Sequence, residues 1–326
     1  MARLRMIQAI NSALREEMAR DPKVILFGED VRMSLFGDTK GLFEEFGPDR
    51  VRDTPISEVL LTGMAVGAAA AGYRVVLHLM YANFLYTGFD AIANQAAKLR
   101  YMTGGQIKLP IVFMASCGGG RSSAAQHSDS PHPMFMNLGG VHVATPGTPA
   151  DAKGMLKSAI RDDNPTIYLT AGGRGGSAGD VPDEDVTTPI GVSFCAREGT
   201  DITVVPIGSM VRPTLTVAER LAKEGISVEV IDPRWMVPLD TSLILKSLTK
   251  TGRLVVVDEA RDLCSAASQI AAVAADQGFS DLKAPVRRLT VPDLAIPYSP
   301  PLERAVLPDA EKIEASIREL VSYKAG

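Results

Sequence analysis

Short apolar runs alternate with segments of helical periodicity along most of the chain. An amphipathic helix is expected at the start, because apolar residues recur there on one helix face: Ile7, Ile10, Leu14 and Met18. Further helices are expected at 62–72, 89–101 and 150–161, and buried strands at 23–27, 75–80, 110–114, 141–144 and 166–169. This alternation predicts βαβ units, in which a mostly parallel sheet carries helices on both faces.

The alternation is interrupted once and then resumes. Residues 171–189 are rich in glycine and acidic residues and almost free of apolar ones, which predicts a linker or crossover. Beyond it, strands are expected at 202–207, 227–231, 254–258 and 286–290, and helices at 213–223, 243–248, 265–275 and 309–321. We therefore predict two doubly wound α/β domains, the first at 1–185 and the second at 186–326.

Composition excludes several classes of function. Of the 326 residues, 46% are hydrophobic and 22% are charged, as in ordinary globular proteins. A net charge of −4 argues against a nucleic-acid partner and against an anionic membrane, and no apolar run approaches the roughly 18 residues that span a bilayer. The three cysteines lack a CxxC spacing and predict neither a zinc site nor a disulfide framework, which fits a cytoplasmic location.

The segment 53–72 contains the most informative residues. Glu58 is expected at the end of an extended stretch, just before a helix rich in small residues, and Gly63 and Gly67 lie one turn apart on one face of that helix. Two interpretations remain open. Either the glycines relieve crowding against the protein's own sheet and Glu58 is solvated, or the helix packs against another subunit and Glu58 is buried there. A buried carboxylate would require a specific partner.

The chain resembles a known enzyme family at these residues and beyond. Pyrimidine-binding domains of thiamine diphosphate enzymes share a pattern of Glu, four residues, Gly, a large apolar residue, two residues and Gly. This chain matches the pattern at Glu58, Gly63, Met64 and Gly67. Further segments resemble the beta subunit of the decarboxylating component of pyruvate, branched-chain 2-oxo acid and acetoin dehydrogenase complexes: Gly28–Val31, Asp53–Glu58, Asn94–Lys98, Ala125–Ser128, Asp151–Gly154 and Ala159–Pro165. The resemblance implies a transketolase-like architecture, with a pyrimidine-binding domain followed by a transketolase C-terminal-like domain.

The resemblance also implies roles for individual residues. Glu58 would hydrogen-bond N1′ of the pyrimidine and favour the imino tautomer, whose 4′-nitrogen takes the C2 proton of the thiazolium. Phe84 would stack on the pyrimidine, unless it is an ordinary core residue. Glu29 would contribute to cofactor binding.

His127 is the histidine expected to act in catalysis. His78 and His142 lie inside strand runs, and His132 follows a proline. His127 instead follows the glycine-rich stretch Gly118–Gly120, which has neither the GxxxxGK[ST] nor the GxGxxG pattern of phosphate sites. We therefore interpret this stretch as a flexible active-site loop. The resemblance implies that His127 faces the substrate and gives or takes protons.

A second site is expected at the end of the helix predicted at 150–161. Backbone carbonyls at a helix C-terminus lack partners within the helix and can coordinate a hard cation. The resemblance implies a structural potassium ion that is held by Ile111, Ala159, Ile160, Asp162 and Asn164. The alternative is an ordinary helix end capped by water.

The sequence lacks the Gly-Asp-Gly motif with which enzymes of this type hold the diphosphate through Mg²⁺. We therefore expect this chain to supply only the pyrimidine half of the thiamine diphosphate site. An alpha subunit would supply Mg²⁺ and the other half in an α2β2 heterotetramer. The segments 132–136, 170–176 and 260–266 depart from the family's usual sequence, which predicts a changed specificity more than a changed fold. Altered substrate or partner contacts are expected at 170–176, and docking to a lipoyl acyltransferase core is expected to be altered or lost because of the change at 260–266.

The leading hypothesis is the beta subunit of a thiamine diphosphate-dependent 2-oxo acid dehydrogenase. Such an enzyme decarboxylates a 2-oxo acid such as pyruvate, or cleaves acetoin, and transfers the acyl group to a lipoyl domain. A split transketolase or a free-standing carboligase without a lipoyl partner is the alternative. A scaffold subunit is a third hypothesis, against which the presence of Glu58, Phe84 and His127 argues.

Overall fold

The computed structural model describes residues 1–171 and 178–324, so most of the divergent segment 170–176 lies outside the described residues. The chain forms two compact units. The first contains Met1–Cys117 and Met134–Ile190, and the second contains Gly118–Pro133 and Gly191–Gly326. These units differ from the expected ranges 1–185 and 186–326, because the segment 118–133 belongs to the second unit, where it bonds to residues such as Glu259 and Glu303.

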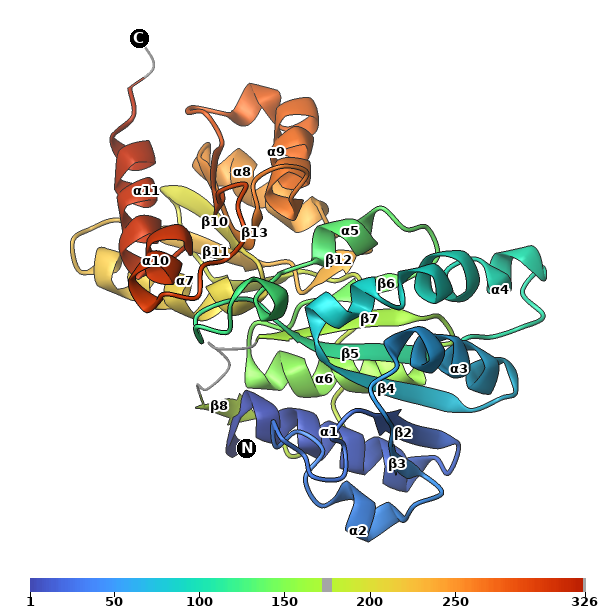
Figure 1. Ribbon diagram of the computed structural model, residues 1–326. Coiled ribbons are helices and arrows are strands. Elements are labelled where there is room, and N and C mark those ends of the chain that lie inside the picture. The colour runs from blue at the N-terminus through green and yellow to red at the C-terminus, as the bar shows by residue number, and fades with distance from the viewer. Residues whose placement is uncertain (172–177, 325–326) are drawn as a thin grey trace. The chain divides into compact units, whose positions relative to one another are not determined.

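The first unit is built on a parallel sheet. Its strands lie in the order β3, β2, β4, β5, β7, β6, and each neighbouring pair is parallel (Figure 1). The strands are β2 (Val24–Gly28), β3 (Val51–Asp53), β4 (Arg74–Tyr81), β5 (Ile111–Cys117), β6 (His142–Ala144) and β7 (Thr166–Ala171). A separate antiparallel ribbon pairs β1 (Ala2–Arg5) with β8 (Ala178–Val181). Because the carboxyl ends of parallel strands meet at one edge, the loops that follow β2 and β4 are where a site is expected.

Helices connect the strands of the first unit. α1 (Met6–Arg20) packs against α6 (Pro149–Arg161), and α3 (Glu58–Ala70) packs on β4 and on the π-helical η2 (Ala91–Ala96). Shorter helical segments are α2 (Leu42–Phe46), η1 (Ala82–Tyr86), α4 (Leu99–Met102) and α5 (His132–Met136). The helix expected at 89–101 is thus divided into η2 and α4. The helix divides at a widened turn, where the N–H of Ala97 donates to the carbonyl of Ile92, five residues earlier, at 2.9 Å.

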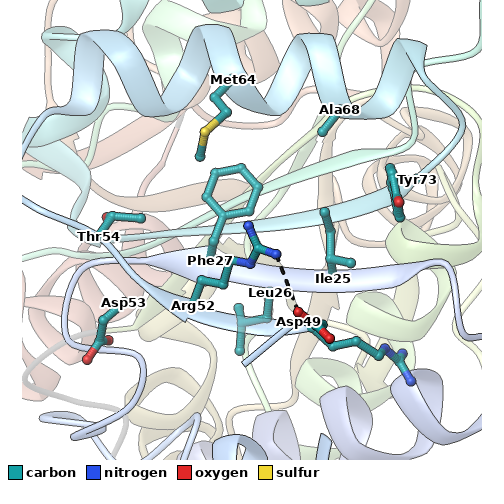
Figure 2. A pocket seen from close by; sticks show the side chains of 11 residues that line it. Ile25, Leu26, Phe27, Asp49, Arg52, Asp53, Thr54, Met64, Ala68 and Tyr73 are labelled. Atoms are coloured by element: carbon teal, nitrogen blue, oxygen red, sulfur yellow. Dashed lines mark ion pairs between the residues drawn. The ribbon is translucent and has the colours of Figure 1, made fainter. Parts of the chain in front are cut away.

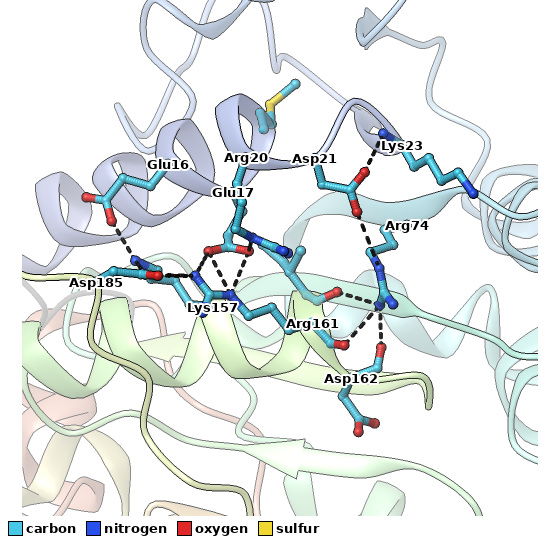
Figure 3. A network of polar contacts seen from close by, with 12 residues as sticks. Glu16, Glu17, Arg20, Asp21, Lys23, Arg74, Lys157, Arg161, Asp162 and Asp185 are labelled. Atoms are coloured by element: carbon cyan, nitrogen blue, oxygen red, sulfur yellow. Dashed lines mark hydrogen bonds and ion pairs between the residues drawn. The ribbon is translucent and has the colours of Figure 1, made fainter.

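An ion-pair network joins α1 and α6 to the crossover that follows β8 (Figure 3). The side chain of Lys157 is 1% exposed, and its ammonium group pairs with Glu16 at 2.6 Å and with Asp185. Arg161 pairs with the buried Glu17 at 2.6 Å and with Asp185 at 2.7 Å. A buried ammonium group without partners would be strongly destabilising, so these ion pairs hold in place a segment that the sequence predicted only as a linker or crossover.

The second unit has its own sheet, with strands in the order β14, β13, β10, β11, β9. β9 is antiparallel to β11, and the other neighbouring pairs are parallel. The strands are β9 (Phe194–Arg197), β10 (Ile202–Pro206), β11 (Val228–Asp232), β13 (Leu254–Arg261) and β14 (Arg287–Val291), with the short β12 (Trp235–Val237) outside this sheet. The helices are α7 (Val211–Ala222), α8 (Ser242–Thr251), α9 (Ala266–Gln277), α10 (Pro300–Val306) and α11 (Ala310–Ser322), with short turns η3 (Ala125–His127), η4 (Gly208–Met210) and η5 (Phe279–Asp281).

The core of the second unit lies between this sheet and helices α7 and α11. Val204, Val230 and Val257 come from three adjacent strands and are fully buried. They share one apolar cluster with Leu221 of α7 and Ile317 of α11. Burying a side chain of this size stabilises the fold by roughly 1.5–3 kcal/mol. The prediction of two α/β units with mostly parallel sheets is confirmed, and none of the helices in 1–171 and 178–324 is long and apolar enough to cross a membrane.

Candidate active site

Glu58 is the first residue of α3 and not the last residue of an extended segment. Its side chain is half-buried, and its backbone carbonyl accepts a hydrogen bond from the hydroxyl of Thr62 at 2.8 Å. The first N–H groups of a helix have no partners within the helix, and a carboxylate is stabilising beside them. The fold therefore places an acid at the N-terminus of α3, a few residues after the carboxyl end of β3.

The glycines of α3 face away from the rest of this chain. Among the described residues, no atom lies within 4 Å of a Cβ built on Gly63 or Gly67. The interpretation that these glycines relieve crowding against the protein's own sheet is therefore wrong. The same helix exposes large apolar side chains, since Val59 is 64% exposed, Leu60 65% and Met64 42%. Apolar surface of this kind is typical of a subunit interface.

Two hollows border α3. One has a volume of about 630 Å³ and is lined by Glu58, by other residues of the first turns of α3 and by Thr87. The other has a volume of about 430 Å³ and is lined by α3, β2 and the segment 49–54. Figure 2 shows Met64 of α3 and Phe27 of β2 pointing toward one another in this second hollow. Glu58 thus opens onto a hollow that is bordered by the glycine-containing face of the helix.

Glu29 directly follows β2 and is buried, with 3% of its surface exposed. Its Oε1 atom has no hydrogen-bond partner in the described part of the chain. The pKa of Glu29 is raised from 4.5 to about 7, first by burial and then by the negative charge of Glu58, while His78 opposes the shift. A Cβ on Gly28 would lie 2.1 Å from the carbonyl oxygen of His78, so glycine is required for β2 and β4 to approach here. The structure thus brings Glu29, Glu58 and His78 together at the carboxyl ends of the strands.

Asp38 belongs to this cluster and was missed by the sequence analysis. Nε2 of His78 lies 3.0 Å from Oδ2 of Asp38, and both residues are buried. Burial by itself would raise the pKa of Asp38, but the charge and the hydrogen bond of His78 outweigh it, so the pKa is lowered. In the sequence Asp38 follows Gly37 but does not continue as a Gly-Asp-Gly motif, so it carries no recognisable signal. No local pattern connects it to a histidine on β4.

Phe84 lies in η1, directly after β4, and is half-buried. Its ring is edge-to-face with Tyr81, with 5.7 Å between the ring centroids. Tyr81 is in turn edge-to-face with Phe36, at 5.4 Å. Part of the Phe84 ring is therefore accessible, so this residue is not a fully buried core phenylalanine and can stack on a planar ligand.

We predict that Glu29→Gln removes a pH-dependent loss of stability. An acid whose pKa is raised in the folded protein contributes stability that is complete below pH 4.5 and is lost as the pH rises through about 7. For Glu29 this loss amounts to about 3 kcal/mol. The free energy of unfolding, measured by urea titration, should fall from about pH 5 to 8 in the wild type and by less in Glu29→Gln. The exposed control Glu44→Gln should keep the wild-type slope, and one common slope for all three proteins would contradict this assignment.

His127 lies in a segment with an unusual backbone, the residues 118–133, which we call the His127 loop. His127 itself is half-buried at the end of η3. Ser122 has φ 54°, and Ala124 has φ 62° with ψ −177°. The conformation of Ala124 is adopted almost only by glycine, and for other residues it costs on the order of 1–3 kcal/mol. Such a conformation persists only where surrounding contacts enforce it.

The contacts that enforce this conformation come from the C-terminal part of the chain. The N–H of Gly119 donates to Oε1 of Glu259 at 2.6 Å. The N–H groups of Gly120 and Ser122 donate to Glu303 at 2.8 and 3.0 Å. Because protein carboxylates already accept from these N–H groups, the glycine-rich stretch does not offer them to a phosphate. The expectation that this stretch is flexible is therefore wrong, because its backbone is anchored, and its role as an active-site loop stays a prediction.

The remainder of the His127 loop is held in the same way. The N–H of Gly118 donates to the carbonyl of Asp129 at 3.0 Å, which joins the two ends of the loop. The side chain of Asp129 pairs with Arg261 at 2.8 Å, and Nε2 of His132 lies 3.1 Å from Oδ1 of Asp258. Burial by itself would raise the pKa of Asp258, but His132 and two backbone N–H groups outweigh it, so the pKa is lowered. Glu29, Glu58 and Phe84 lie in the first unit, whereas His127 lies in the second.

Two of the carbonyl groups expected to hold potassium, those of Ile160 and Asp162, already accept hydrogen bonds from the guanidinium group of Arg74. Nη1 of Arg74 donates to the carbonyl of Ile160 at 3.0 Å and to that of Asp162 at 2.9 Å. Oδ1 of Asp162 accepts from the side-chain amide of Asn164 at 2.8 Å. The pKa of Asp162 is about 2, because hydrogen bonds from His142 and Asn164 outweigh the opposing effect of burial. The alternative interpretation, a helix end capped by water alone, is therefore wrong for the carbonyls of Ile160 and Asp162.

The other two expected potassium ligands are Ile111, at the start of β5, and Ala159, in the last turn of α6. Both are fully buried. A carbonyl oxygen has two lone pairs, so an ion can share a carbonyl with a guanidinium group. A potassium ion bound by this set would have to share the carbonyls of Ile160 and Asp162 with Arg74.

We predict that Arg74→Ala lowers the free energy of unfolding by about 3 kcal/mol, because it leaves several carbonyls at the end of α6 without their charged donor. Urea titrations in KCl and in choline chloride at equal ionic strength would show how much of this loss of stability a bound potassium ion compensates. The exposed Arg52, which makes one hydrogen bond to the carbonyl of Pro48, offers the matched control Arg52→Ala. Equal stabilities of Arg74→Ala and Arg52→Ala would show that the cap is unimportant.

Cys195 forms a cluster with Glu198 and Glu229, whose side chains are also potential metal ligands. Its Sγ and the carboxylates of Glu198 and Glu229 lie within 4.8 Å of one another. Lys250 pairs with both acids, at 3.1 Å for Glu198. The ammonium group therefore supplies positive charge to this cluster.

Two family models match the chain. The model for the transketolase pyrimidine binding domain matches residues 2–171, and the model for the transketolase C-terminal domain matches residues 194–313. The acetoin:2,6-dichlorophenolindophenol oxidoreductase subunit beta of Bacillus subtilis (strain 168) is 41% identical, over 98% of both chains. From the same organism, the 2-oxoisovalerate dehydrogenase subunit beta is 40% identical over 97% of this chain and 98% of its own length. The pyruvate dehydrogenase E1 component subunit beta is 38% identical over 99% of this chain and 100% of its own length.

Solved structures show the same fold at lower identity. A split gene transketolase, described as an inactive beta4 tetramer, superposes with a TM-score of 0.80 at 24% identity, over 99% of this chain and 100% of that chain. A transketolase from Pichia stipitis superposes with a TM-score of 0.69 at 16% identity, over 99% of this chain and 46% of that chain. These similarities support the fold and not a particular reaction.

Proposed function

The chain belongs to the transketolase-like family whose members include the beta subunits of pyruvate, 2-oxoisovalerate and acetoin dehydrogenases, and from this premise we propose that it is the beta subunit of a thiamine diphosphate-dependent 2-oxo acid dehydrogenase. The enzyme would decarboxylate a 2-oxo acid such as pyruvate, or cleave acetoin, and transfer the acyl group to a lipoyl domain. The observation that carries this proposal is the half-buried Glu58 at the N-terminus of α3, beside an exposed face with two glycines.

The residues around Glu58 fit the pyrimidine half of thiamine diphosphate. Oε1 of Glu29 is buried without a hydrogen-bond partner among the described residues, and Phe84 offers part of its ring for stacking. Bound in such a site, the cofactor supplies a nucleophilic carbon and an electron sink for decarboxylation. Glu58 would hydrogen-bond N1′ and so hold a proton at the pyrimidine. A Glu29 with a pKa of about 7 would help to keep the site from carrying two full negative charges at neutral pH.

His127 would give or take protons at the substrate. An imidazole changes charge near neutral pH, and the anchored His127 loop would fix its place. The alternative role, in which His127 only packs in its loop, predicts unchanged turnover when the side chain is removed.

The partners follow from the exposed face of α3. The glycines allow close approach of another backbone, and the exposed large apolar side chains beside them provide surface for a partner to bury. The chain also lacks the Gly-Asp-Gly motif for Mg²⁺ and the diphosphate. We therefore assign Mg²⁺ to an alpha subunit in an α2β2 heterotetramer in the cytoplasm. A structural potassium ion at the end of α6 completes the proposal. Docking to a lipoyl acyltransferase core is proposed only in an altered form, because the segment 260–266 departs from the family's usual sequence.

A split transketolase or a carboligase without a lipoyl partner is the second candidate. The split gene transketolase shares the fold at 24% identity, which by itself favours neither reaction. The relatives that are 38–41% identical over nearly the whole chain favour the dehydrogenase subunit instead.

Calorimetric titration of thiamine diphosphate with Mg²⁺ tests the proposed half-site. The cofactor is titrated first into this chain alone and then into its mixture with a candidate alpha subunit. Binding is expected only in the mixture, and tight binding to the lone chain would contradict the division of the site. The mixture is then assayed with pyruvate, 2-oxoisovalerate and acetoin, using 2,6-dichlorophenolindophenol as electron acceptor. Reaction with sugar phosphates alone would favour the transketolase.

A further inference from the structure

Two carboxylates of the C-terminal part of the chain have no role in the chemistry proposed above. Glu259 lies near the end of β13 and Glu303 lies in α10, and they are 7% and 3% exposed. Buried carboxylates require hydrogen-bond donors. The donors here are backbone N–H groups that lie 140 and 183 residues away in the chain, in the His127 loop.

The contacts between the carboxylates and the loop are close. Oε1 of Glu303 accepts from the N–H of Gly120, and Oε2 accepts from the N–H and the hydroxyl of Ser122 at 3.0 and 3.2 Å. The hydroxyl of Ser209 donates to Oε2 of Glu259 at 2.6 Å. This bond orients the carboxylate, whose other oxygen accepts from the N–H of Gly119. A Cβ on Gly118 would lie 2.9 Å from Glu259, so the loop backbone rests against its side chain.

The donors held by Glu303 adjoin the strained part of the loop. Ser122 has a positive φ and donates to Glu303 through two groups. Ala124, in the conformation that normally requires glycine, follows two residues later and directly precedes η3, which ends at His127. Charge-assisted hydrogen bonds are about twice as strong as neutral ones, and here they act on Gly120 and Ser122, which have φ angles of 93° and 54°.

We propose that Glu259 and Glu303 are positioning residues for the reaction, which hold the backbone of residues 119–122 so that the His127 loop presents His127 to the substrate. The inference rests on the proposed function of His127. Glutamine has the same size but no charge, and its NH2 group cannot accept a hydrogen bond from a backbone N–H. Glu303→Gln should therefore loosen the loop while leaving the side chain's volume unchanged.

A double-mutant cycle in the heterotetramer tests the proposal. Glu303→Gln is expected to lower kcat by about 10–100-fold with KM nearly unchanged, and to leave exchange of the cofactor's C2 proton within about threefold of the wild type. In the His127→Ala background the same substitution should lower kcat by less than about twofold, because its effect runs through His127. Equal fold losses in both backgrounds would overturn the proposal, since they would show an effect that does not depend on His127.

Hydrogen exchange provides a second measurement that does not depend on activity. Amide exchange in residues 118–128 should accelerate by about tenfold or more in Glu303→Gln and in Glu259→Gln, and stay at the wild-type rate in Glu219→Gln, an exposed control on α7. Unchanged exchange in both test variants would overturn the proposal, and either variant suffices if the other fails to fold. If the wild-type complex acts on no 2-oxo acid and not on acetoin, the proposed function fails, while the exchange rates still decide whether the carboxylates hold the loop.

Discussion

Glu58→Ala is expected to lower turnover of the heterotetramer by at least about 10³-fold, the largest effect of any single substitution in this chain. The reason is that Glu58 is the acid proposed to hold a proton at the pyrimidine of thiamine diphosphate, without which the C2 proton is not removed. Exchange of that C2 proton for deuterium, followed by nuclear magnetic resonance, measures this step directly. Exchange should be lost together with turnover.

The exposed Glu44 on α2 provides the matched control. Glu44→Ala removes the same charge from the same unit and should leave both exchange and turnover at wild-type levels. Thermal unfolding of the two variants separates loss of chemistry from loss of fold. Wild-type turnover in Glu58→Ala would refute the proposed role of Glu58 and, with it, the assignment of the pyrimidine half-site to this chain.

His127→Ala is expected to lower kcat by about 10²–10⁴-fold, the range that a positioned proton donor or acceptor contributes. Because Glu58 acts before the substrate reacts, C2 proton exchange and cofactor affinity should stay close to those of the wild type. Steady-state kinetics with the substrate identified in the mixture, together with the exchange measurement, test this combination. The result would separate the chemistry at the cofactor from the chemistry at the substrate.

Gln126→Ala is the control for this prediction, because Gln126 is the exposed neighbour of His127 in η3. It should change kcat by no more than about twofold. Unchanged kcat in His127→Ala would show that the histidine only packs in its loop. A combined loss of turnover, exchange and cofactor affinity would instead assign His127 to cofactor binding.

Much of the fold and part of the site follow from the sequence alone. Alternation of apolar runs with helical periodicity predicts most strands of both sheets, but not the edge strands β3 and β9. The signal exists because the apolar residues of one buried face lie only a few positions apart in the sequence. The pattern from Glu58 to Gly67 likewise fixes an acid next to a glycine-containing helix face. The sequence left open whether that face meets the protein's own sheet, and the structure excludes this, because the space beside Gly63 and Gly67 is empty of described atoms.

Only the tertiary structure decided which distant groups meet. It joined Asp38 to His78, capped the end of α6 with Arg74, and buried Glu29 beside Glu58 so that its pKa rises to about 7. It also placed the His127 loop with the second unit, against Glu259 and Glu303. Periodicity reports on neighbours along the chain, whereas these contacts join residues 29 (Glu29 and Glu58) to 183 positions apart. Their partners are mostly backbone carbonyls and N–H groups, which every residue carries and which therefore leave no signal in the sequence.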